Sequence, residues 1–258
     1  MLFFIFMKSI LCTNDAKKKT TSPQLPKRYD FLKEFPHCNF GPLMQQCGSC
    51  YAYSTLKAMS HRFCRALGKR IQLSPQYLVA CDLTNNGCLG GSEINAYYFL
   101  EQNGVTDISC HPWKNVTEYS DAFCSKCSTN KNMILYKAKY LSTKHVYGVE
   151  EIKKELYSSG PLTINVAVDN NFRMYKSGIY QSSLKKLPEA GNHSIELIGW
   201  GKKNGVPFWI GYNQYGLEWG INGRIYIRMG TNEALVESFA YASEPDLSNF
   251  DLSKSHEL

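Results

Sequence analysis

A cysteine at the predicted start of a helix is the side chain in this sequence best suited to covalent chemistry. Cys50 follows a glycine-containing turn, and behind it apolar residues recur at helical spacing before a glycine at position 68: Tyr53, Leu56, Met59, Phe63 and Leu67. The spacing predicts a helix over 50–67. Free N–H groups and the dipole at a helix N-terminus stabilise a thiolate. Cys50 is therefore a candidate nucleophile, although a lone cysteine at such a position is more often structural.

Two residues far downstream favour a nucleophilic role for Cys50 over a structural one. His193 opens a predicted strand, and Asn213 follows the next predicted strand. An imidazole can take a proton from a thiol and return it to a leaving group, and an amide oxygen can fix the ring that does so. A cysteine followed by a distant histidine and then an asparagine is typical of a thiol nucleophile with its base and orienting group. We therefore expect these three side chains to meet in the folded protein.

The predicted secondary structure that must bring these three residues together differs between the first and the second part of the chain. After the helix over 50–67, the sequence predicts helices over 75–80 (behind a Ser74 cap), 93–102 and 149–158. Runs of β-branched and aromatic residues predict strands over 162–168, 195–200, 207–212 and 224–229. Helices dominate the first part and strands the second, which favours an α+β fold over an alternating α/β fold.

Composition limits the classes of protein to consider. The chain has 258 residues, 43% hydrophobic and 20% charged, so it can bury one large core or two packed halves. Its formal charge of +7 comes from 29 Lys and Arg against 22 Asp and Glu, and the basic residues are scattered except for the run over 17–19. A nucleic-acid-binding surface requires clustered basic residues, so we expect no nucleic-acid partner.

The cysteines point to an oxidising compartment. There are ten of them, and all but Cys12 fall between positions 38 and 127. Two Cys-x-x-Cys pairs, at 47–50 and 124–127, leave a zinc site as an alternative. We expect disulfides and no metal.

Three segments together resemble the papain-like cysteine protease family. They are Cys47-Gly48-Ser49-Cys50-Tyr51, the stretch from Asn192-His193 to Trp200-Gly201, and 208–220, which carries Asn213. The resemblance extends over about 25–245 and implies a papain-like fold, in which a helical half packs against an antiparallel β-barrel half with the active cleft between them. It implies a cysteine endopeptidase without a cofactor. Peptides or proteins would be its substrates, and cystatin-like inhibitors would be partners.

The same resemblance implies a role for each residue. Cys50 would attack a peptide carbonyl, and His193 would protonate the departing amine and then activate water for deacylation, with Asn213 fixing its ring. The sequence departs from the family close to these residues. Met44 stands where the family has its oxyanion-hole glutamine, and a thioether donates no hydrogen bond, so Gln45 would have to serve beside the N–H of the nucleophile.

Further departures surround the site. Tyr51 and Tyr215 replace tryptophans, and Gln214 replaces a small residue, although Tyr215 is still expected to cover the bond between the histidine and the asparagine. These changes, together with Met44, keep open a second hypothesis: a catalytically silent homologue that binds peptides or proteins.

The cysteine pattern resembles the cathepsin B branch. That resemblance implies the bridges Cys38–Cys64, Cys47–Cys88, Cys81–Cys124 and Cys110–Cys127. The loop between Cys110 and Cys124 is shorter than in cathepsin B and lacks its adjacent histidine pair. We therefore expect endopeptidase rather than carboxydipeptidase activity, and we expect the single His111 there to be a surface residue.

Substrate-contacting residues are also implied by the resemblance. Gly90 and Gly91 would bind extended substrate through the main chain, and Tyr215 would border the site. Phe239 would give the second substrate pocket an apolar floor that favours hydrophobic side chains, with Glu93 at the opposite edge. A turn that requires positive φ is another explanation for the glycines, and both can hold.

The ends of the chain carry expectations about processing and location. We expect residues 1–24 to be a signal, short pro-segment or linker, and 25–250 to be the peptidase domain, with a helical half over about 25–128, a β-barrel half over about 129–250 and a tail over 251–258. The first apolar stretch is too short to span a membrane. We expect a monomer in the secretory pathway that acts in a lysosome- or vacuole-like compartment or outside the cell. Asn115 is a candidate glycosylation site, and Ser255-His256-Glu257-Leu258 is a candidate endoplasmic-reticulum retrieval signal.

Overall fold

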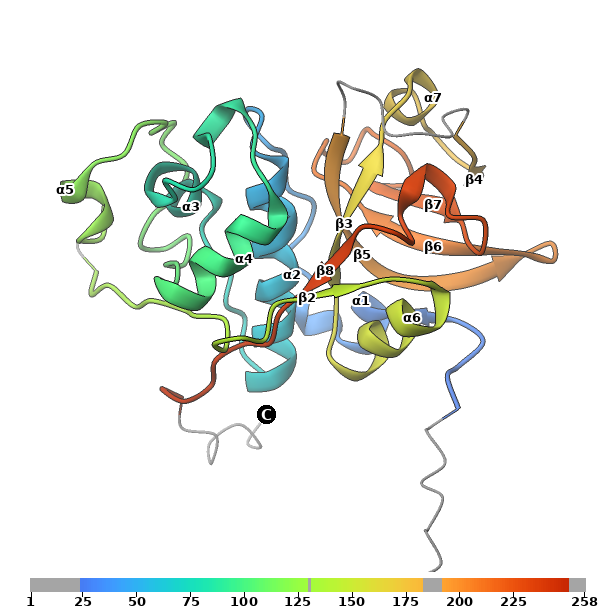
Figure 1. The fold of residues 1–258 in the computed structure, drawn as a ribbon, viewed down its shortest axis with the longest axis horizontal. Helices are drawn as coiled ribbons and strands as arrows, with labels where there is room; N and C mark the ends of the chain where they lie inside the picture. Colours follow the sequence, from blue (N-terminus) through green and yellow to red (C-terminus); the bar gives the residue numbers. More distant parts are fainter. Residues whose placement is uncertain (1–23, 130, 183–191, 251–258) are drawn as a thin grey trace, which may run out of the picture.

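The computed structural model describes residues 24–129, 131–182 and 192–250, in two parts that lie side by side (Figure 1). One part is built mainly from helices and the other around an eight-stranded sheet, so the fold is α+β as expected. None of the described helices combines the length and the apolar character needed to cross a membrane.

The helical part is organised around α2, which runs from Cys50 to Leu67. Gly68 ends it in the left-handed conformation, with φ of 65°, and its N–H donates to Cys64 O. The Ser74 hydroxyl caps the next helix by accepting the Tyr77 N–H at 3.1 Å. The helices that follow are α3 (Pro75–Cys81), α4 (Glu93–Gln102) and α5 (Asp121–Cys124), with a 3-10 turn at Gly87–Leu89. The predicted helices over 50–67, 75–80 and 93–102 are confirmed.

All strands found among the described residues belong to the second part. In chain order they are β1 (Tyr29–Asp30), β2 (Lys144–Val146), β3 (Leu162–Ala167), β4 (Ile179–Tyr180), β5 (Asn192–Lys203), β6 (Val206–Tyr212), β7 (Arg224–Arg228) and β8 (Ala240–Ala242). Its short helices and turns are α1 (Phe31–Glu34), α6 (Val149–Ser158), α7 (Asn170–Arg173), Pro36–Cys38 and Glu233–Leu235. The four predicted strands and the helix over 149–158 are confirmed.

The sheet is open, which corrects the expectation of a closed antiparallel barrel. Its order is β2-β8-β3-β5-β6-β7-β4, with β1 paired to β5, and within the described residues the edge strands β2 and β4 do not pair with each other. Closure requires the two edges to exchange backbone hydrogen bonds over a shared length. Here β4 is a two-residue strand, and it pairs with β7 in parallel orientation.

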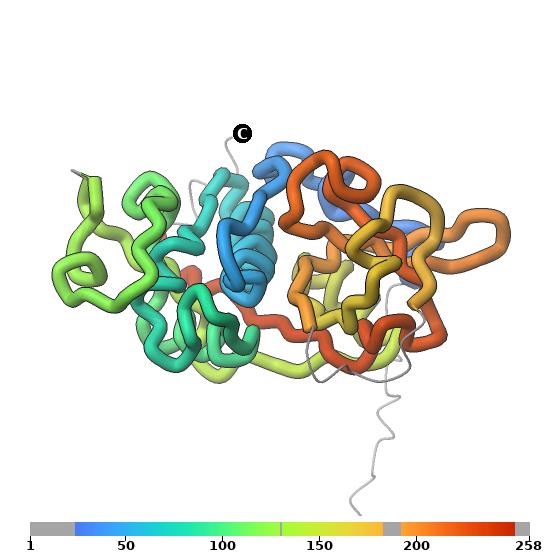
Figure 2. The backbone as a smooth tube through the Cα atoms, turned by 90° about the horizontal axis from the view of Figure 1, so that it is seen from above, coloured from blue at the N-terminus to red at the C-terminus, as the bar shows by residue number. Residues whose placement is uncertain are grey.

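The two hydrophobic cores do not follow the order of the chain. The early residues Tyr29, Phe31 and Leu32 belong to the core of the sheet part. Late residues, including Leu247 and Phe250, pack against the core of the helical part. Figure 2 shows this exchange, because the C-terminal segment (red) passes from beside the sheet to the helical part. An N-terminal segment therefore packs in the sheet part, and the C-terminal segment packs against the helical part.

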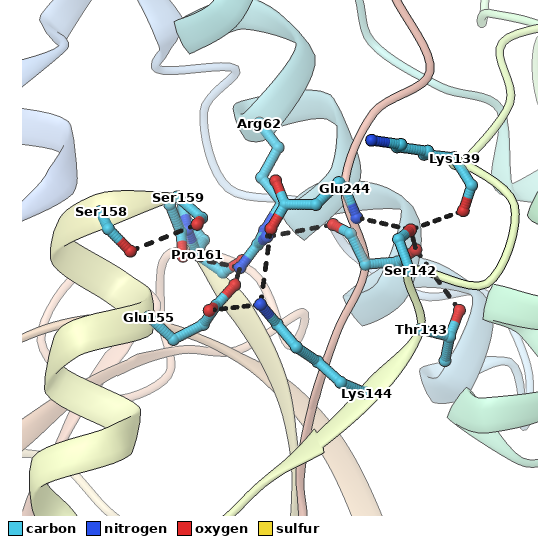
Figure 3. A network of polar contacts seen from close by, with 12 residues as sticks. Arg62, Lys139, Ser142, Thr143, Lys144, Glu155, Ser158, Ser159, Pro161 and Glu244 are labelled. Carbon is cyan, nitrogen blue, oxygen red and sulfur yellow. Dashed lines mark hydrogen bonds and ion pairs between the residues drawn. The ribbon is translucent and has the colours of Figure 1, made fainter. Parts of the chain in front are cut away.

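A buried arginine on the helix that begins at Cys50 joins the two parts. Arg62 on α2 places Nη2 2.8 Å from Glu155 Oε1 on α6, and its Nε donates to Pro161 O at 2.7 Å (Figure 3). Its Nη1 donates to Ser243 O in the C-terminal segment at 3.0 Å. Lys144 Nζ lies 2.8 Å from the second oxygen of Glu155. Because a buried guanidinium needs such partners, the network fixes α2 against the sheet part.

Within the described ranges, four disulfides cross-link the chain: Cys38–Cys64, Cys47–Cys88, Cys81–Cys124 and Cys110–Cys127. They are the same pairs that the resemblance implied. Each of the two Cys-x-x-Cys pairs has at least one cysteine engaged in a disulfide to a residue outside the pair, so neither offers two thiolates for zinc.

Candidate active site

Cys50 is the first residue of α2 and a free, half-buried cysteine. The turn before it is fastened by the Cys47–Cys88 disulfide and by the Gly48 N–H, which donates to Cys88 O at 3.1 Å. A Cβ on Gly48 would lie 2.6 Å from that oxygen, so a side chain would displace the turn. As the first helical residue, Cys50 has an N–H without an intrahelical acceptor. The turn thus presents a thiol and a free N–H together.

His193 and Asn213 form the hydrogen bond expected between a catalytic imidazole and its orienting amide. Nε2 of His193 on β5 lies 2.8 Å from Oδ1 of Asn213, directly after β6. The same Oδ1 accepts the Gln214 N–H at 2.8 Å, which identifies it as the oxygen because a backbone N–H can only donate. Nε2 must therefore carry the proton in this bond. In the neutral ring, Nδ1 is then the unprotonated nitrogen, free to accept a proton.

Ser194, the residue that follows His193, is linked to Cys50 through Gln214. Gln214 Nε2 donates to Cys50 O at 3.3 Å and to Ser194 O at 2.5 Å. These bonds are made where α2 packs directly against β5. The structure therefore brings all three candidate catalytic residues into one region, between the helical part and the sheet.

Aromatic rings cover the imidazole. Tyr215 stacks on His193 with ring centroids 4.8 Å apart and an interplanar angle of 24°, and Phe172 approaches edge-on at 6.0 Å. Trp219 in turn packs edge-on against Tyr215 at 5.7 Å. Only 5% of the His193 surface is exposed. Tyr215 thus covers the ring that is bonded to Asn213, as the sequence led us to expect.

Burial sets the protonation states of the pair. It lowers the pKa of His193 to about 4, against the opposing effect of the Asn213 hydrogen bond. Burial also raises the pKa of the Cys50 thiol, which hydrogen bonds from Ser194 and the Tyr51 backbone partly offset. The lowered pKa of His193 and the raised pKa of Cys50 both favour a neutral thiol beside a neutral imidazole in the absence of substrate. Because the two groups exchange a proton, their titrations belong to the pair.

Gln214 is a site residue that sequence reasoning treated only as a departure. Its side-chain amide donates to Ser194 O at 2.5 Å and to Cys50 O at 3.3 Å, and it is 1% exposed. One amide group therefore ties the start of α2 to β5. The sequence showed only that a glutamine follows Asn213. It could not show the two acceptors of the Gln214 amide, because Cys50 and Ser194 are distant from it in sequence.

The whole-chain comparison agrees with this geometry. Residues 25–244 match the model of the family described as "Papain family cysteine protease". The chain belongs to the papain family of cysteine proteases. It is thus a papain-like cysteine peptidase whose substrates are peptides or proteins.

Named relatives of this papain-family chain are cathepsin B-like. It is 34% identical to "Cathepsin B-like CP2" of Giardia intestinalis over 86% of this chain and 75% of that protein. It is 35% identical to "Cathepsin B-like CP3" of the same organism over 84% and 74%, respectively. Its fold matches the solved structure of "proCathepsin B S9 from Trypanosoma congolense" with a TM-score of 0.77 and 26% identity, over 86% of this chain and 78% of that one. The papain-like fold is therefore confirmed.

Met44 and Gln45, the two residues considered from sequence for the oxyanion site, lie shortly before Cys50. Met44 is 59% exposed and forms a backbone bridge with Tyr215. The Gln45 N–H donates to Gln214 O at 3.0 Å, and its side-chain Nε2 donates to Cys47 O at 2.9 Å. The amide of Gln45 is thus held within the turn that precedes Cys50.

Gly90 and Gly91 each have a structural reason to lack a side chain. Gly90 has φ of 117°, which side-chain-bearing residues rarely adopt. A Cβ on Gly91 would lie 2.4 Å from Asn85 Oδ1, and that oxygen accepts the Ser92 N–H at 2.6 Å. Gly91 is exposed, so its main chain faces solvent without a covering side chain.

Glu93 and Phe239 lie on either side of Asn165 on β3. Glu93 Oε1 accepts from Asn165 Nδ2 at 2.9 Å and also from the Ser194 hydroxyl. Phe239 O accepts the Asn165 N–H at 2.8 Å, and its ring stacks at 6.5 Å on His145. The Glu93 carboxylate therefore lies against Ser194, next in sequence to His193, whereas the Phe239 ring stacks on His145 of β2. Nothing in the sequence pattern marked Asn165 or Ser194 as partners of Glu93.

His111 is buried, which corrects the expectation of a surface residue. Its ring nitrogens lie 2.9 Å from Thr106 Oγ1 and 3.0 Å from Phe123 O, and the residue is fully covered. Tyr77 and Phe123 pack around the ring. The disulfides of Cys110 and Cys124 fold the loop inward over it, which local sequence could not reveal.

Proposed function

We propose that this chain is an active cysteine endopeptidase that cleaves peptide bonds through a thioacyl intermediate on Cys50. The observation that supports this most strongly is the His193 Nε2 to Asn213 Oδ1 bond of 2.8 Å, formed where Gln214 Nε2 bonds both Cys50 O and Ser194 O. It leaves Nδ1 of His193 as the nitrogen available to the thiol.

The proposed reaction uses that nitrogen twice. The Cys50 thiol gives its proton to His193 Nδ1 as the sulfur attacks the peptide carbonyl, and the imidazolium then protonates the leaving amine. In deacylation His193 takes a proton from water, whose oxygen attacks the thioester and releases the acid and the free thiol. Asn213 keeps the ring in the correct tautomer throughout. A buried neutral pair suits this sequence, because charge separation is needed only as substrate reacts.

The oxyanion would be held by the free N–H of Cys50 and by the Gln45 amide. The position of Gln45 in the turn directly before Cys50 supports this assignment, since its Nε2 has a second N–H besides the one given to Cys47 O. Removing one such donor in other hydrolases costs about a hundredfold to a thousandfold in rate.

Extended substrate would bind along Gly90 and Gly91, next to Tyr215, with Glu93 and Phe239 contributing to the pocket for the following side chain. The exposed main chain of Gly91 supports the first part of this proposal. Endopeptidase action is supported by the buried state of His111, which leaves no histidine available in the described part of the loop to capture a substrate carboxylate.

We further propose that the protein acts in the secretory pathway or in a compartment reached through it. Four disulfides support an oxidising route. The sequon residue Asn115 is exposed, as glycosylation requires. Residues 1–23 of the expected signal, pro-segment or linker (1–24) and the terminal Ser255-His256-Glu257-Leu258 lie outside the described residues.

An electrophilic epoxide that reacts with activated thiols tests the proposal. We expect one adduct, located at Cys50 by mass spectrometry, together with hydrolysis of a fluorogenic peptide. His193→Ala should abolish both, whereas His37→Ala, which changes an exposed histidine, should leave both intact. Folded protein that binds peptide but forms no adduct would instead identify a silent homologue.

A further inference from the structure

The strand that carries His193 extends past the end of its neighbour. β5 begins at Asn192, but its pairing with β6 begins only at Glu196, opposite Tyr212. On its other side the same segment is paired with β3. In the ladder of described residues, the first part of β5 thus has no backbone partner on β6. The carbonyl of Ser194, which points to this open side, needs a donor from elsewhere.

The side chain of Gln214 supplies that donor and a second bond to the helix. Its Nε2 donates to Ser194 O at 2.5 Å and to Cys50 O at 3.3 Å. A primary amide has two N–H groups, so one side chain can serve both carbonyls. Only 1% of the Gln214 surface is exposed, so solvent does not compete for these bonds. The start of α2 and the end of β5 that carries His193 are thus bonded to one nitrogen.

The backbone of Gln214 contacts the remaining parts of the candidate site. Its N–H donates to Asn213 Oδ1 at 2.8 Å, and the same oxygen is bonded to His193 Nε2. Its carbonyl accepts the Gln45 N–H at 3.0 Å, in the turn before Cys50. One buried residue therefore contacts the orienting amide, the turn before the thiol, the start of α2 and the strand of the imidazole.

We propose that Gln214 is a positioning residue that holds the Cys50 thiol in place against the imidazole of His193. Its two side-chain hydrogen bonds fix the first turn of α2 to the open side of β5, so that the thiol can pass its proton to Nδ1. Misplacing a catalytic group by about 1 Å costs on the order of a hundredfold in rate. Gln214 is buried and acts only through its neighbours. The inference rests on the proposed role of Cys50 as nucleophile.

Other contacts of the same elements do not replace this one. A second polar link between α2 and β5 joins Lys57 Nζ to Glu196 Oε2 at 4.0 Å, about two helical turns beyond the thiol. The Cys47–Cys88 disulfide fastens the turn before α2, but it fastens that turn to the helical part. Neither contact fixes the first turn of α2 directly to β5.

Two rates measured on Gln214→Met test the proposal. Methionine is similar in size to glutamine but has no N–H to donate. We expect kcat for a fluorogenic peptide to fall about tenfold or more, with KM nearly unchanged. Alkylation of Cys50 by iodoacetamide, followed by mass spectrometry, should slow about tenfold near pH 7, where His193 accepts the thiol proton. It should be unchanged near about pH 10, where hydroxide removes that proton. A merely structural role would not produce this difference.

Gln76→Met is the matched control. Gln76 on α3 is also buried, and its amide also bonds a distant loop: Nε2 donates to Val116 O at 2.6 Å, and Oε1 accepts the Lys114 N–H at 2.8 Å. We expect this change to lower the urea midpoint of unfolding. It should leave kcat and both alkylation rates of the folded protein within about twofold.

Gln214→Glu provides a second test if Gln214→Met does not fold. The introduced carboxyl is buried and faces two carbonyl oxygens, which raises its pKa, and only its protonated form can donate. Its kcat, divided by that of the unsubstituted chain at the same pH, should therefore rise as pH falls from about 8 to about 5. A flat ratio would count against the two hydrogen bonds as the positioning contact.

The outcomes separate this inference from the proposed function. An unsubstituted chain that neither hydrolyses peptide nor is alkylated at Cys50 would overturn the proposed function. Full kcat in folded Gln214→Met, or equal slowing of alkylation at both pH values, would overturn the positioning role alone. Failure of both Gln214 variants to fold would also overturn it, because the residue would then be needed for folding rather than for positioning.

Discussion

Nδ1 of His61 lies 2.5 Å from Oε1 of Glu196, and both side chains are completely buried. Lys57 joins them, with Nζ 4.0 Å from Glu196 Oε2 and 3.1 Å from the centre of the Tyr212 ring. Lys57 and His61 belong to α2, Glu196 to β5 and Tyr212 to β6. These are the elements that begin with Cys50, carry His193 and precede Asn213, so a buried charge cluster holds together the scaffold of the candidate triad.

Removing the acid from this cluster is predicted to destabilise the protein strongly. Glu196→Ala leaves the Lys57 ammonium buried without a counter-charge and His61 Nδ1 without its partner, and we expect a loss on the order of 3–5 kcal/mol in the free energy of unfolding. Urea unfolding followed by tryptophan fluorescence measures it. Glu151→Ala, which removes an exposed partner of Lys154, is the control and should cause no measurable change. A loss below about 1 kcal/mol for Glu196→Ala would show that the cluster contributes little.

Lys57 predicts a specific dependence of stability on pH. Burial lowers its pKa to about 8, despite the attraction of Glu196, from 10.5 in the unfolded chain. Between these values the unfolded chain binds more protons than the folded one, so the contribution of Lys57 to stability rises as pH increases from about 8 to 10.5. We expect Lys57→Met to remove this rise, seen as a difference between the two proteins in urea unfolding at each pH. Parallel curves for both would contradict the lowered pKa.

Asn213 is predicted to affect turnover more than substrate binding. Asn213→Ala frees the imidazole to rotate, and misplacing a catalytic group by about 1 Å costs on the order of a hundredfold. Steady-state hydrolysis of a fluorogenic peptide should show that loss in kcat with KM nearly unchanged. Asn170→Ala, at an exposed position on α7, should match the unsubstituted chain. An equal loss in both variants would argue against an orienting role.

Adjacent glutamines give a matched test of the oxyanion site. Gln45→Ala removes the amide in the turn before Cys50, and we expect kcat to fall about a hundredfold. Gln46 is exposed, and its Nε2 donates to Met44 O at 3.0 Å, so Gln46→Ala should change kcat less than twofold if it makes no contact with the reacting carbonyl. If Gln45→Ala retained full activity, the Cys50 N–H would have to act with a different donor.

Local patterns determined much of the scaffold. Helical spacing after Cys50 and the glycine at position 68 fixed both ends of α2, because a left-handed cap and an apolar stripe are properties of neighbouring residues. The strands that carry His193 and precede Asn213 followed from their β-branched and aromatic residues. The sequence showed the order of the three candidate residues for the same reason. Each of them lies at or next to the end of a helix or strand that local patterns predict.

Tertiary packing decided which residues surround Cys50, His193 and Asn213. The contacts of Glu93 with Ser194, of Gln214 with Cys50 O and of Lys57 with Glu196 depend on how far α2 and α4 are shifted and rotated against β5. A sequence pattern gives the face of a helix but not its register against a sheet. The burial of His111 and the open edge of the sheet likewise depend on segments that meet only in the folded chain. The sequence by itself thus determined which groups could react, whereas the packing of the two parts decided which neighbours set their proton affinities.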